Sequence, residues 1–466
     1  MAAARSLGRA NRLSAHSGSA AIETPTGKSS TADKTGPLGW YTVGILAVVS
    51  MLSYVDRGVM ALFVEPMKRD FGLSDTEMGW LLGLAFTLPY VLVGIPMARL
   101  IDRGSRRNLI AGALAIWSFA TALCGIAQNY ATLFVCRFVT GSAESVNTSG
   151  AYSMVADAVS RKMLPRAYAI LSGGVTGGAA LSLLVGGVLY GMLVNIPPTH
   201  VGGIGVIHNW QLVFMIVGLP GLLAALLMWR TVPEPVRRGG TRPEGYPVRE
   251  VLGFVKEKGA LHGPLLAGTI LLATMSHAFA AWMPAFYDRS YGWGPEVAGP
   301  IMGIMSLVAS VIGLIGGAKL AEWMGERRAD ANLRVVFLVN LVSWPLLTLA
   351  PLMPNAWLAL ICASLAGAIG IMAGPPLMAA IQLTTPNEMR AQMNVMYGAG
   401  MTAIGGSVGP FLVGFLTDYV APSTDDLRYV LVAVKFVLGP MAIFLLWKAV
   451  GPYGRIYSQR LEEEQQ

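Results

Sequence analysis

The sequence predicts an all-α membrane protein with twelve transmembrane helices arranged as two pseudo-symmetric six-helix bundles. Composition is the first indication, because 54% of the 466 residues are hydrophobic and only 13% are charged, about half the charged share of a typical soluble domain. The second is the recurrence of apolar windows of about 20 residues, the length that crosses a bilayer as a helix. The third is a central hydrophilic interruption that divides these windows six and six.

The apolar windows follow one another with short polar connections. They are 40–63, 78–100, 108–127, 130–155, 166–194, 210–230, 264–287, 296–320, 332–351, 355–382, 390–417 and 427–450. Most contain Gly or Pro, which spanning helices tolerate because neighbouring helices satisfy the freed backbone groups. We therefore expect a first bundle at 40–230, a second bundle at 264–450 and a cytoplasmic tail at 451–466. Residues 1–39, rich in Ala, Ser, Thr and Gly, predict a disordered cytoplasmic tail.

The central interruption, 231–263, is expected to be a cytoplasmic linker. It opens with Pro233, Pro235 and a Gly-Gly pair, as linkers do. It then reads VREVLGFVKEKG at 248–259, where apolar residues recur at helical spacing opposite charged ones. This pattern predicts a short amphipathic helix lying on the inner membrane surface.

The two halves resemble each other, which indicates internal duplication. The segments 157–167 and 385–391 each contain a Pro shortly before Arg-Ala, and each precedes a Gly-rich span. The Gly-rich runs are GGVTGGAALSLLVGG at 173–187 and GAGMTAIGGSVGPFLVG at 398–414. Small residues at this spacing let helices approach closely, so these runs predict either tight packing or a surface on which helices slide.

The basic residues predict the orientation of the chain. Of the 34 Lys and Arg residues, 27 fall in segments on one side of the spans and four on the other, namely Lys68, Arg69, Arg289 and Arg428. This asymmetry predicts cytoplasmic termini and an integral protein of the plasma (inner) membrane. It accounts for the net charge of +8 without a nucleic-acid partner.

The three cysteines, Cys124, Cys136 and Cys362, lie inside predicted spans. They are expected to be small buried hydrophobic residues, because their spacing fits neither a disulfide framework nor a metal site. We therefore expect no cofactor, no metal and a monomer.

Two of the predicted spans together carry four charged residues that sum to zero: Asp56 and Arg57 in the first, and Arg137 and Glu144 in the fourth. A charge at membrane depth costs at least about 2.5–3.5 kcal/mol, so it is retained where it is paired or lines a wet cavity. Asp56 and Arg137 both fall ~10 Å below the same membrane surface. Equal depth predicts an Asp56–Arg137 ion pair, with Arg57 and Glu144 available to exchange partners. The alternative is a fixed salt bridge that only joins the two spans.

Such a group suits a transport pathway with proton coupling. Burial opposes ionisation of a carboxylate while a neighbouring Arg favours it, so Asp56 or Glu144 can accept a proton when an anionic substrate captures the Arg. His277, in the seventh span, is either a proton relay or a packing histidine. Lys435, in the last span, is expected to extend its ammonium toward the outer interface. The second half offers an apolar, adaptable cavity wall, made of Phe279, Trp282, Phe286, Met372 and Met396.

The loop between the second and third spans reads A-R-L-I-D-R-G-S-R-R at 98–107. It is similar to the signature inner loop of the major facilitator superfamily, G-x-x-x-D-R-x-G-R-[KR], and Asp102, Arg103, Arg106 and Arg107 match. A weaker copy at 318–328 places Glu322 in the acidic position. The resemblance implies the major facilitator fold and an inner charge network that locks one conformation, with Arg390 as a candidate partner of Asp102. The alternative is that these charges only anchor topology.

Three further segments look like the Spinster family: Y-V-D-R-G at 54–58, R-F-V-T-G-S-A-E-S-V-N-T-S-G-A-Y-S-M-V-A-D at 137–157, and V-P-E-P-V-R-R-G at 232–239. The resemblance covers most of the first half and the linker. It implies proton-coupled movement of lysolipids or sphingoid phosphates, with Asp56, Arg57, Arg137 and Glu144 as the substrate and proton site. Ser53 stands where that family usually has Asn, and Ala143 replaces a Gly before Glu144.

Other functions remain open at this point. An organic-anion symporter, for example for acidic sugars, shares the D-R pair and the R-x-x-x-G-x-G-E pattern, and a drug exporter of the same superfamily is a further alternative. A membrane enzyme would need a catalytic cluster, and the short loops contain no Ser-His-Asp, HExxH or paired-carboxylate arrangement. A gated channel would more often show a repeated pore ring than a six-plus-six duplication.

Overall fold

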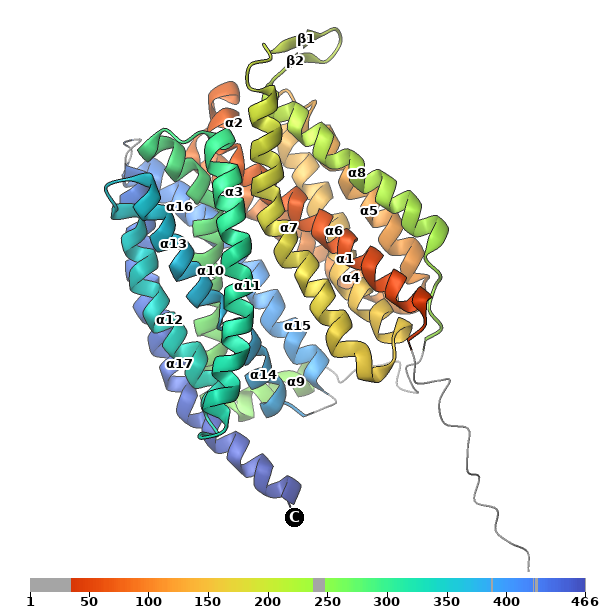
Figure 1. The fold of residues 1–466 in the computed structure, drawn as a ribbon, viewed down its shortest axis with the longest axis vertical. Coiled ribbons are helices and arrows are strands. Elements are labelled where there is room, and N and C mark those ends of the chain that lie inside the picture. Colours follow the sequence, from red (N-terminus) through yellow and green to blue (C-terminus); the bar gives the residue numbers. More distant parts are fainter. Residues whose placement is uncertain (1–34, 238–247, 387–388, 422, 424–425, 466) are drawn as a thin grey trace, which may run out of the picture.

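The computed structural model describes residues 35–237, 248–386, 389–421, 423 and 426–465, and these form two helical bundles side by side (Figure 1). The first bundle contains α1 (Pro37–Leu62), α2 (Val64–Phe71), α3 (Asp75–Leu82), α4 (Leu84–Arg103), α5 (Arg106–Cys124), α6 (Tyr130–Ala158), η1 (Arg161–Met163), α7 (Leu164–Leu193) and α8 (Asn209–Thr231). A small antiparallel hairpin, β1 (Thr199–Val201) and β2 (Gly205–Ile207), joins α7 to α8, with Thr199 opposite Ile207.

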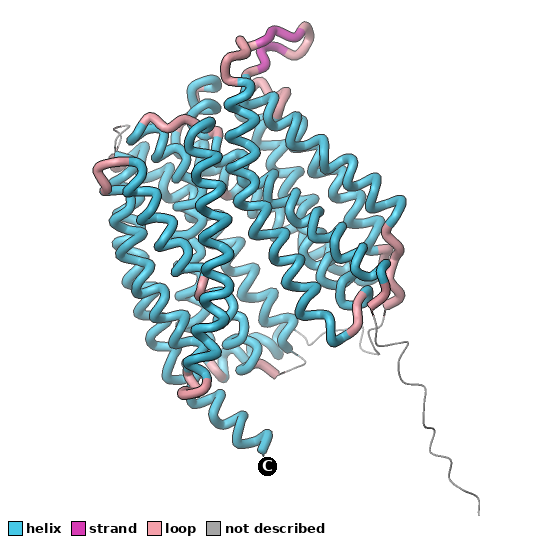
Figure 2. Tube along the Cα trace, in the orientation of Figure 1, coloured by secondary structure: helices cyan, strands magenta, loops and turns pink. Residues whose placement is uncertain are grey.

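The second bundle follows the linker helix α9 (Val248–Glu257). It contains α10 (Gly259–Tyr291), α11 (Pro295–Gly325), α12 (Ala331–Leu349), η2 (Ala350–Leu352), α13 (Ala356–Ile371), α14 (Gly374–Thr384), α15 (Arg390–Gly400), the π-helical turn η4 (Met401–Gly406), α16 (Ser407–Tyr419) and α17 (Leu427–Gln465). Loops and turns gather at the two ends of the bundles (Figure 2). We call the end that carries β1 and β2 the hairpin end, and the end that carries α9 the linker end.

The expected twelve spans are present among the described residues. Eleven helical segments are long and apolar enough to cross a membrane. The twelfth is α6, which has 29 residues but is made more polar by Arg137, Glu144 and several Ser, Thr and Asn residues. Three spans are interrupted. Gly83 separates α3 from α4, and η4 separates α15 from α16. Helix α14 begins at Gly374-Pro375-Pro376, where the prolines lack the N–H groups that would continue α13.

The apolar core is shared between the bundles at the hairpin end and divided at the linker end. One cluster includes Phe63, between α1 and α2, and Trp282 and Phe286 of α10, so it spans both bundles. Two other clusters, one around Trp117 and one around Tyr397, belong to the first and second bundle respectively. Buried apolar area is the main cohesive term in a packed interior, so the bundles are joined mainly at the hairpin end.

Close helix contacts bring the bundles together there. Helix α7 packs on α11 and α3 packs on α16. At the α7–α11 contact the α-carbon of Gly299 lies 2.9 Å from where a β-carbon at Gly187 would stand. The Gly-rich run of α7 therefore packs tightly, as one of the two interpretations of the sequence predicts.

Three expectations about the segments outside the bundles are refined. Most of the expected tail, 1–34, lies outside the described residues, and α1 begins at Pro37. The expected amphipathic helix is α9, but Val251, Phe254 and Val255 pack against the core of the second bundle instead of facing a membrane. Residues 451–465 continue α17 as a helix, and the Arg460 guanidinium donates to the carbonyl oxygens of Leu383 and Thr385 at 3.0 and 3.1 Å.

Candidate functional site

The charged group inside the first bundle is centred on Arg57 of α1 and Glu144 of α6. The Arg57 Nε donates to Glu144 Oε2 at 2.7 Å. The hydroxyl of Ser53, one turn earlier on α1, donates to the same oxygen at 2.7 Å. The Glu144 side chain is fully buried, and its Oε1 has no hydrogen-bond partner among the described residues. An unsatisfied buried oxygen is costly, so Oε1 is available to accept a further hydrogen bond.

Aromatic rings enclose the Arg57 guanidinium. Its carbon lies 4.9 Å from the ring centre of Tyr54, 4.6 Å from that of Phe86 and 4.9 Å from that of Tyr90. The Arg137 guanidinium lies 4.9 Å from the same Phe86 ring. Cations within about 6 Å of a ring face are attracted by its quadrupole. Phe86 of α4 therefore contacts both arginines.

The expected Asp56–Arg137 ion pair is wrong in this conformation. Arg137 Nη1 instead contacts the backbone oxygen of Asp56 at 3.5 Å, and the Asp56 side chain lies beside Thr121 and Trp117 of α5. Both residues are nonetheless buried in the bundle, with 3% and 4% of their surface exposed. Asp56 and Arg57 are adjacent on a helix and point about 100° apart, so only one of them can face α6.

The charged group is partly exposed, and polar side chains lie on both sides of it. The side chain of Arg57 is 22% exposed, and Tyr90 and Thr148, which share a hydrogen bond of 3.0 Å, line its approach. Just beyond the site toward the hairpin end, the hydroxyls of Thr87 on α4 and Ser407 on α16 share a hydrogen bond between the bundles. Both of these side chains are buried. The two bundles are therefore in direct contact next to the site.

The second bundle contributes less of the expected wall than the sequence suggested. Trp282 and Phe286 are fully buried in the shared core, so their assignment to a cavity wall is wrong in this conformation. Phe279 is 8% exposed and faces the Lys435 ammonium at 4.5 Å. Lys435 is itself 4% exposed, so its expected position at the outer interface is also wrong.

Three other residues of the second bundle are placed as follows. His277 is exposed, and its Nδ1 lies 2.8 Å from the Ala273 carbonyl oxygen. Its role as a relay stays a prediction. Met372 is half-buried against Gly316 and Gly317 of α11, and Met396 is half-buried at the edge of the second bundle's core. Neither methionine touches the charged group in any contact among the described residues.

A second polar cluster, which the sequence reasoning missed, holds the bundles together at the hairpin end. Arg289 of α10 forms ion pairs with Glu65 and Asp75 of the first bundle, each at 2.6 Å, and Lys68 also pairs with Asp75. The Asp418 carboxylate of α16 accepts from the backbone N–H groups of Asp75 and Thr76 at 3.1 and 2.6 Å. We call these residues the hairpin-end latch. The concentration of charged residues at 65–77 could have indicated such a cluster, but a segment between two spans is most simply interpreted as a solvent-exposed loop.

The signature loop at the linker end forms a different network from the expected one. Arg106 pairs with Asp157 and, at 2.9 Å, with Glu234, and the backbone N–H of Arg107 donates to Glu234 at 2.8 Å. Asp102, Arg103 and Glu322 are exposed without a described partner. Arg390 donates to the carbonyl oxygens of Gln382 and Thr385. The expected lock between Asp102 and Arg390 is therefore not formed in this conformation.

Glu234 joins the linker to this loop. Burial opposes its ionisation, but hydrogen bonds from the Arg107 backbone, the Arg106 guanidinium and the Ser105 hydroxyl outweigh burial and hold the pKa of this carboxyl below its usual range. Arg237, three residues on, donates to the carbonyl oxygens of Ile101 and Gly104 at 2.7 and 2.8 Å. The start of the linker is thus fastened to the first bundle.

Comparisons with known proteins agree on the fold. A family model described as Major Facilitator Superfamily matches residues 46–410. An MFS-type efflux pump of Mycolicibacterium smegmatis is 31% identical over 401 residues, 85% of this chain and 88% of that protein. A probable galactarate/D-glucarate transporter of Bacillus subtilis is 23% identical over 480 residues, 95% of this chain and 97% of that protein.

A solved structure shows a similar arrangement of helices. It is a bacterial homolog to the human lysosomal transporter Spinster, in an inward-facing and unoccupied conformation. Its TM-score is 0.73 at 24% identity, over 91% of this chain and 98% of that one.

Proposed function

The chain belongs to the Major Facilitator Superfamily, and we propose that it is a proton-coupled secondary transporter that moves an amphipathic anion by alternating access. The membrane-embedded transporter fold follows from the family. The proton coupling, the substrate class and the direction of transport are our proposal, and they rest on the site described above.

One observation carries the proposal: Arg57, partly exposed and surrounded by aromatic rings, is paired with a fully buried Glu144 that has one unsatisfied oxygen. An anionic head group arriving from the open end competes with Glu144 for the Arg57 guanidinium, and Arg137 lies within reach of the same Phe86 ring. When Arg57 is drawn to the substrate, Glu144 loses its neutralising partner and binds a proton. Substrate binding and proton binding are then linked through a single side chain.

We infer that the substrate carries an apolar tail, such as a lysophospholipid or a sphingoid phosphate. The cage is aromatic, and the motifs at 54–58, 137–157 and 232–239 resemble the Spinster family. The second candidate is an acidic sugar, favoured by the relative from Bacillus subtilis that matches over nearly its whole length. A drug-like cation fits the two arginines poorly, although one relative is an efflux pump. Affinity that rises with acyl-chain length separates the lipid from the sugar.

The orientation is also a proposal. The excess of basic residues at the linker end favours a cytoplasmic position for that end. In that orientation the described conformation, closed at the hairpin end, presents the site to the cytoplasm.

Transport by purified protein in liposomes tests the coupling. With an imposed pH gradient, we expect Glu144→Gln to abolish gradient-driven uptake or export and Asp56→Asn to weaken it, while both proteins stay folded. Arg137→Ala is expected to weaken binding of lysophosphatidic acid in a thermal-shift assay. The matched control is Glu326→Gln, an exposed carboxylate at the linker end. Gradient-driven transport at the wild-type rate by Glu144→Gln would remove the role we assign to it.

A further inference from the structure

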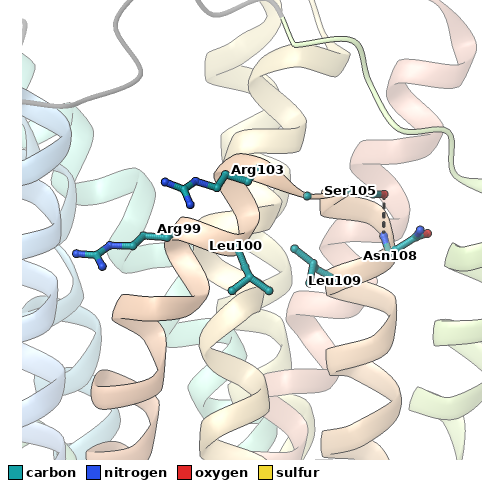
Figure 3. Close-up of a pocket in the computed structure, with 7 residues that line it drawn as sticks. Arg99, Leu100, Arg103, Ser105, Asn108 and Leu109 are labelled. Carbon is teal, nitrogen blue, oxygen red and sulfur yellow. Dashed lines mark hydrogen bonds between the residues drawn. The ribbon is translucent and has the colours of Figure 1, made fainter.

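A pocket of about 550 Å³ lies at the linker end, between the end of α4 and the start of α5, away from the charged site. Figure 3 shows its lining, with the guanidinium groups of Arg99 and Arg103 projecting in the same direction from α4, away from Ser105 and Asn108. Both arginines are exposed, and neither has a hydrogen-bond or ion-pair partner within the described part of the chain. Leu100 and Leu109 supply the apolar part of the pocket.

An exposed apolar stripe on α4 leads to these two arginines. Leu88, Leu92 and Ile95 are 48%, 59% and 62% exposed. The positions 88, 92, 95, 99 and 103 are spaced by three or four residues, so they share one face of the helix. From Leu88 to Arg99 the rise is ~16 Å, which is close to the ~15 Å thickness of one leaflet's hydrocarbon.

We propose that this face of α4 binds an anionic phospholipid of the leaflet at the linker end. The lipid phosphate lies between Arg99 and Arg103, and an acyl chain lies along Ile95, Leu92 and Leu88. Charge complementarity selects an anionic head group, because two guanidiniums without a described partner project in the same direction from α4. Each of them offers a forked set of donors to phosphate. The length of the apolar stripe selects a lipid over a free anion. This inference goes beyond the transport proposal, since it concerns a lipid that stays bound at a second site.

Native mass spectrometry of the purified full chain tests the proposal with dioleoylphosphatidylglycerol, dioleoylphosphatidylcholine and inorganic phosphate as probes. We expect the wild type to retain phosphatidylglycerol in preference to phosphatidylcholine. Each basic residue near an anionic head group is worth about fivefold in affinity, so Arg99→Gln/Arg103→Gln is expected to lose phosphatidylglycerol by about 25-fold. Because neither side chain has a described partner, this variant should fold.

The matched control is Arg166→Gln/Arg455→Gln, which removes the same charge from two other exposed arginines of the linker end. It is expected to retain phosphatidylglycerol like the wild type. Equal retention by the Arg99/Arg103 variant, or an equal loss in the control, would overturn the site. Displacement of phosphatidylglycerol by an equal concentration of inorganic phosphate would also overturn it, because the pocket would then recognise an anion without a tail.

Discussion

Arg57 makes four contacts through one planar group, and this geometry is open to a conservative test. Lysine carries the same charge but concentrates it at one atom, so it cannot both donate to Glu144 from a Nε position and stack on three rings. We expect Arg57→Lys to bind lysophosphatidic acid about tenfold more weakly, by about 1.4 kcal/mol, as measured by isothermal titration. Arg230→Lys is the control, because Arg230 stacks on the exposed Trp229 at 5.4 Å. Unchanged affinity in Arg57→Lys would show that the cage does not shape the site.

The sequence located the charged residues of the site but not their pairing. A charge inside an apolar window is visible from composition alone, so Asp56, Arg57, Arg137 and Glu144 were all predicted. Counting residues along a span predicts how deep each side chain lies in the membrane. It does not predict toward which neighbouring helix the side chain points, and the pairing depends on both. Arg57 faces Glu144, while Asp56 faces α5. Phe86 and Tyr90 were not predicted, because an aromatic residue in an apolar span carries no signal of what it touches.

At the scale of elements, apolar periodicity predicted the spans well. The span at 130–155 was predicted as an apolar window, and it forms α6, although its charged and polar residues leave it out of the eleven most apolar spans. Other features needed tertiary contacts. Lys435 is a charged residue in an apolar window, and the simplest prediction sends it to the nearer interface. In the structure it is covered by α10, with Phe279 against its ammonium.

The contact between α7 and α11 depends on Gly187. A β-carbon there would lie 2.5 Å from Pro300 Cδ and 2.7 Å from the Pro295 carbonyl oxygen, so Gly187→Ala must push the helices apart. Overpacking of this kind costs about 1–3 kcal/mol. We expect faster hydrogen–deuterium exchange in 187–193 and 295–303. Gly177→Ala on the same helix is the control, because a β-carbon there meets nothing within 4 Å. Equal exchange in the two variants would contradict this account of the contact.

The fastening of the linker to the first bundle should depend on pH through Glu234. Its folded-state pKa is below the ordinary value of 4.5, so its contribution to stability is complete above about pH 4.5 and is lost as the pH falls through the folded-state value. Thermal melts of wild type and Glu234→Gln should therefore differ at neutral pH. The difference should shrink as the pH falls below about 4.5. A difference that stays constant down to the lowest pH at which the protein folds would refute the assignment.

Over the whole molecule, the hydrogen bonds and ion pairs that join the bundles between described residues lie at or beyond Thr87 and Ser407, on the hairpin side. The shared core lies at the same end. The sequence could not predict this, because the pairs involved are separated by more than 200 residues. The charged residues are visible in the sequence, but the way in which the two bundles pack against each other determines which of them form pairs. Alternation then requires that the hairpin-end latch opens while a contact forms at the linker end.

Substitutions in the hairpin-end latch are expected to change the balance between conformations. Arg289 and Asp75 are 7% and 3% exposed, and breaking a buried pair by removing one partner costs about 3–5 kcal/mol. Under the proposed alternating access, the two bundles separate at the hairpin end in the other conformation. The cost of the substitution then falls mainly on the conformation described above. We expect Arg289→Gln/Asp418→Asn to shift the population toward opening at the hairpin end. Spin labels on the exposed Tyr419 and Ile196 should report longer distances by double electron–electron resonance.

Asp330→Asn, which removes an ion pair within the second bundle, is the control and should leave the distances unchanged. A wild-type distance distribution in the latch variant would mean that apolar packing alone closes that end, and the charges would then have no part in the conformational equilibrium.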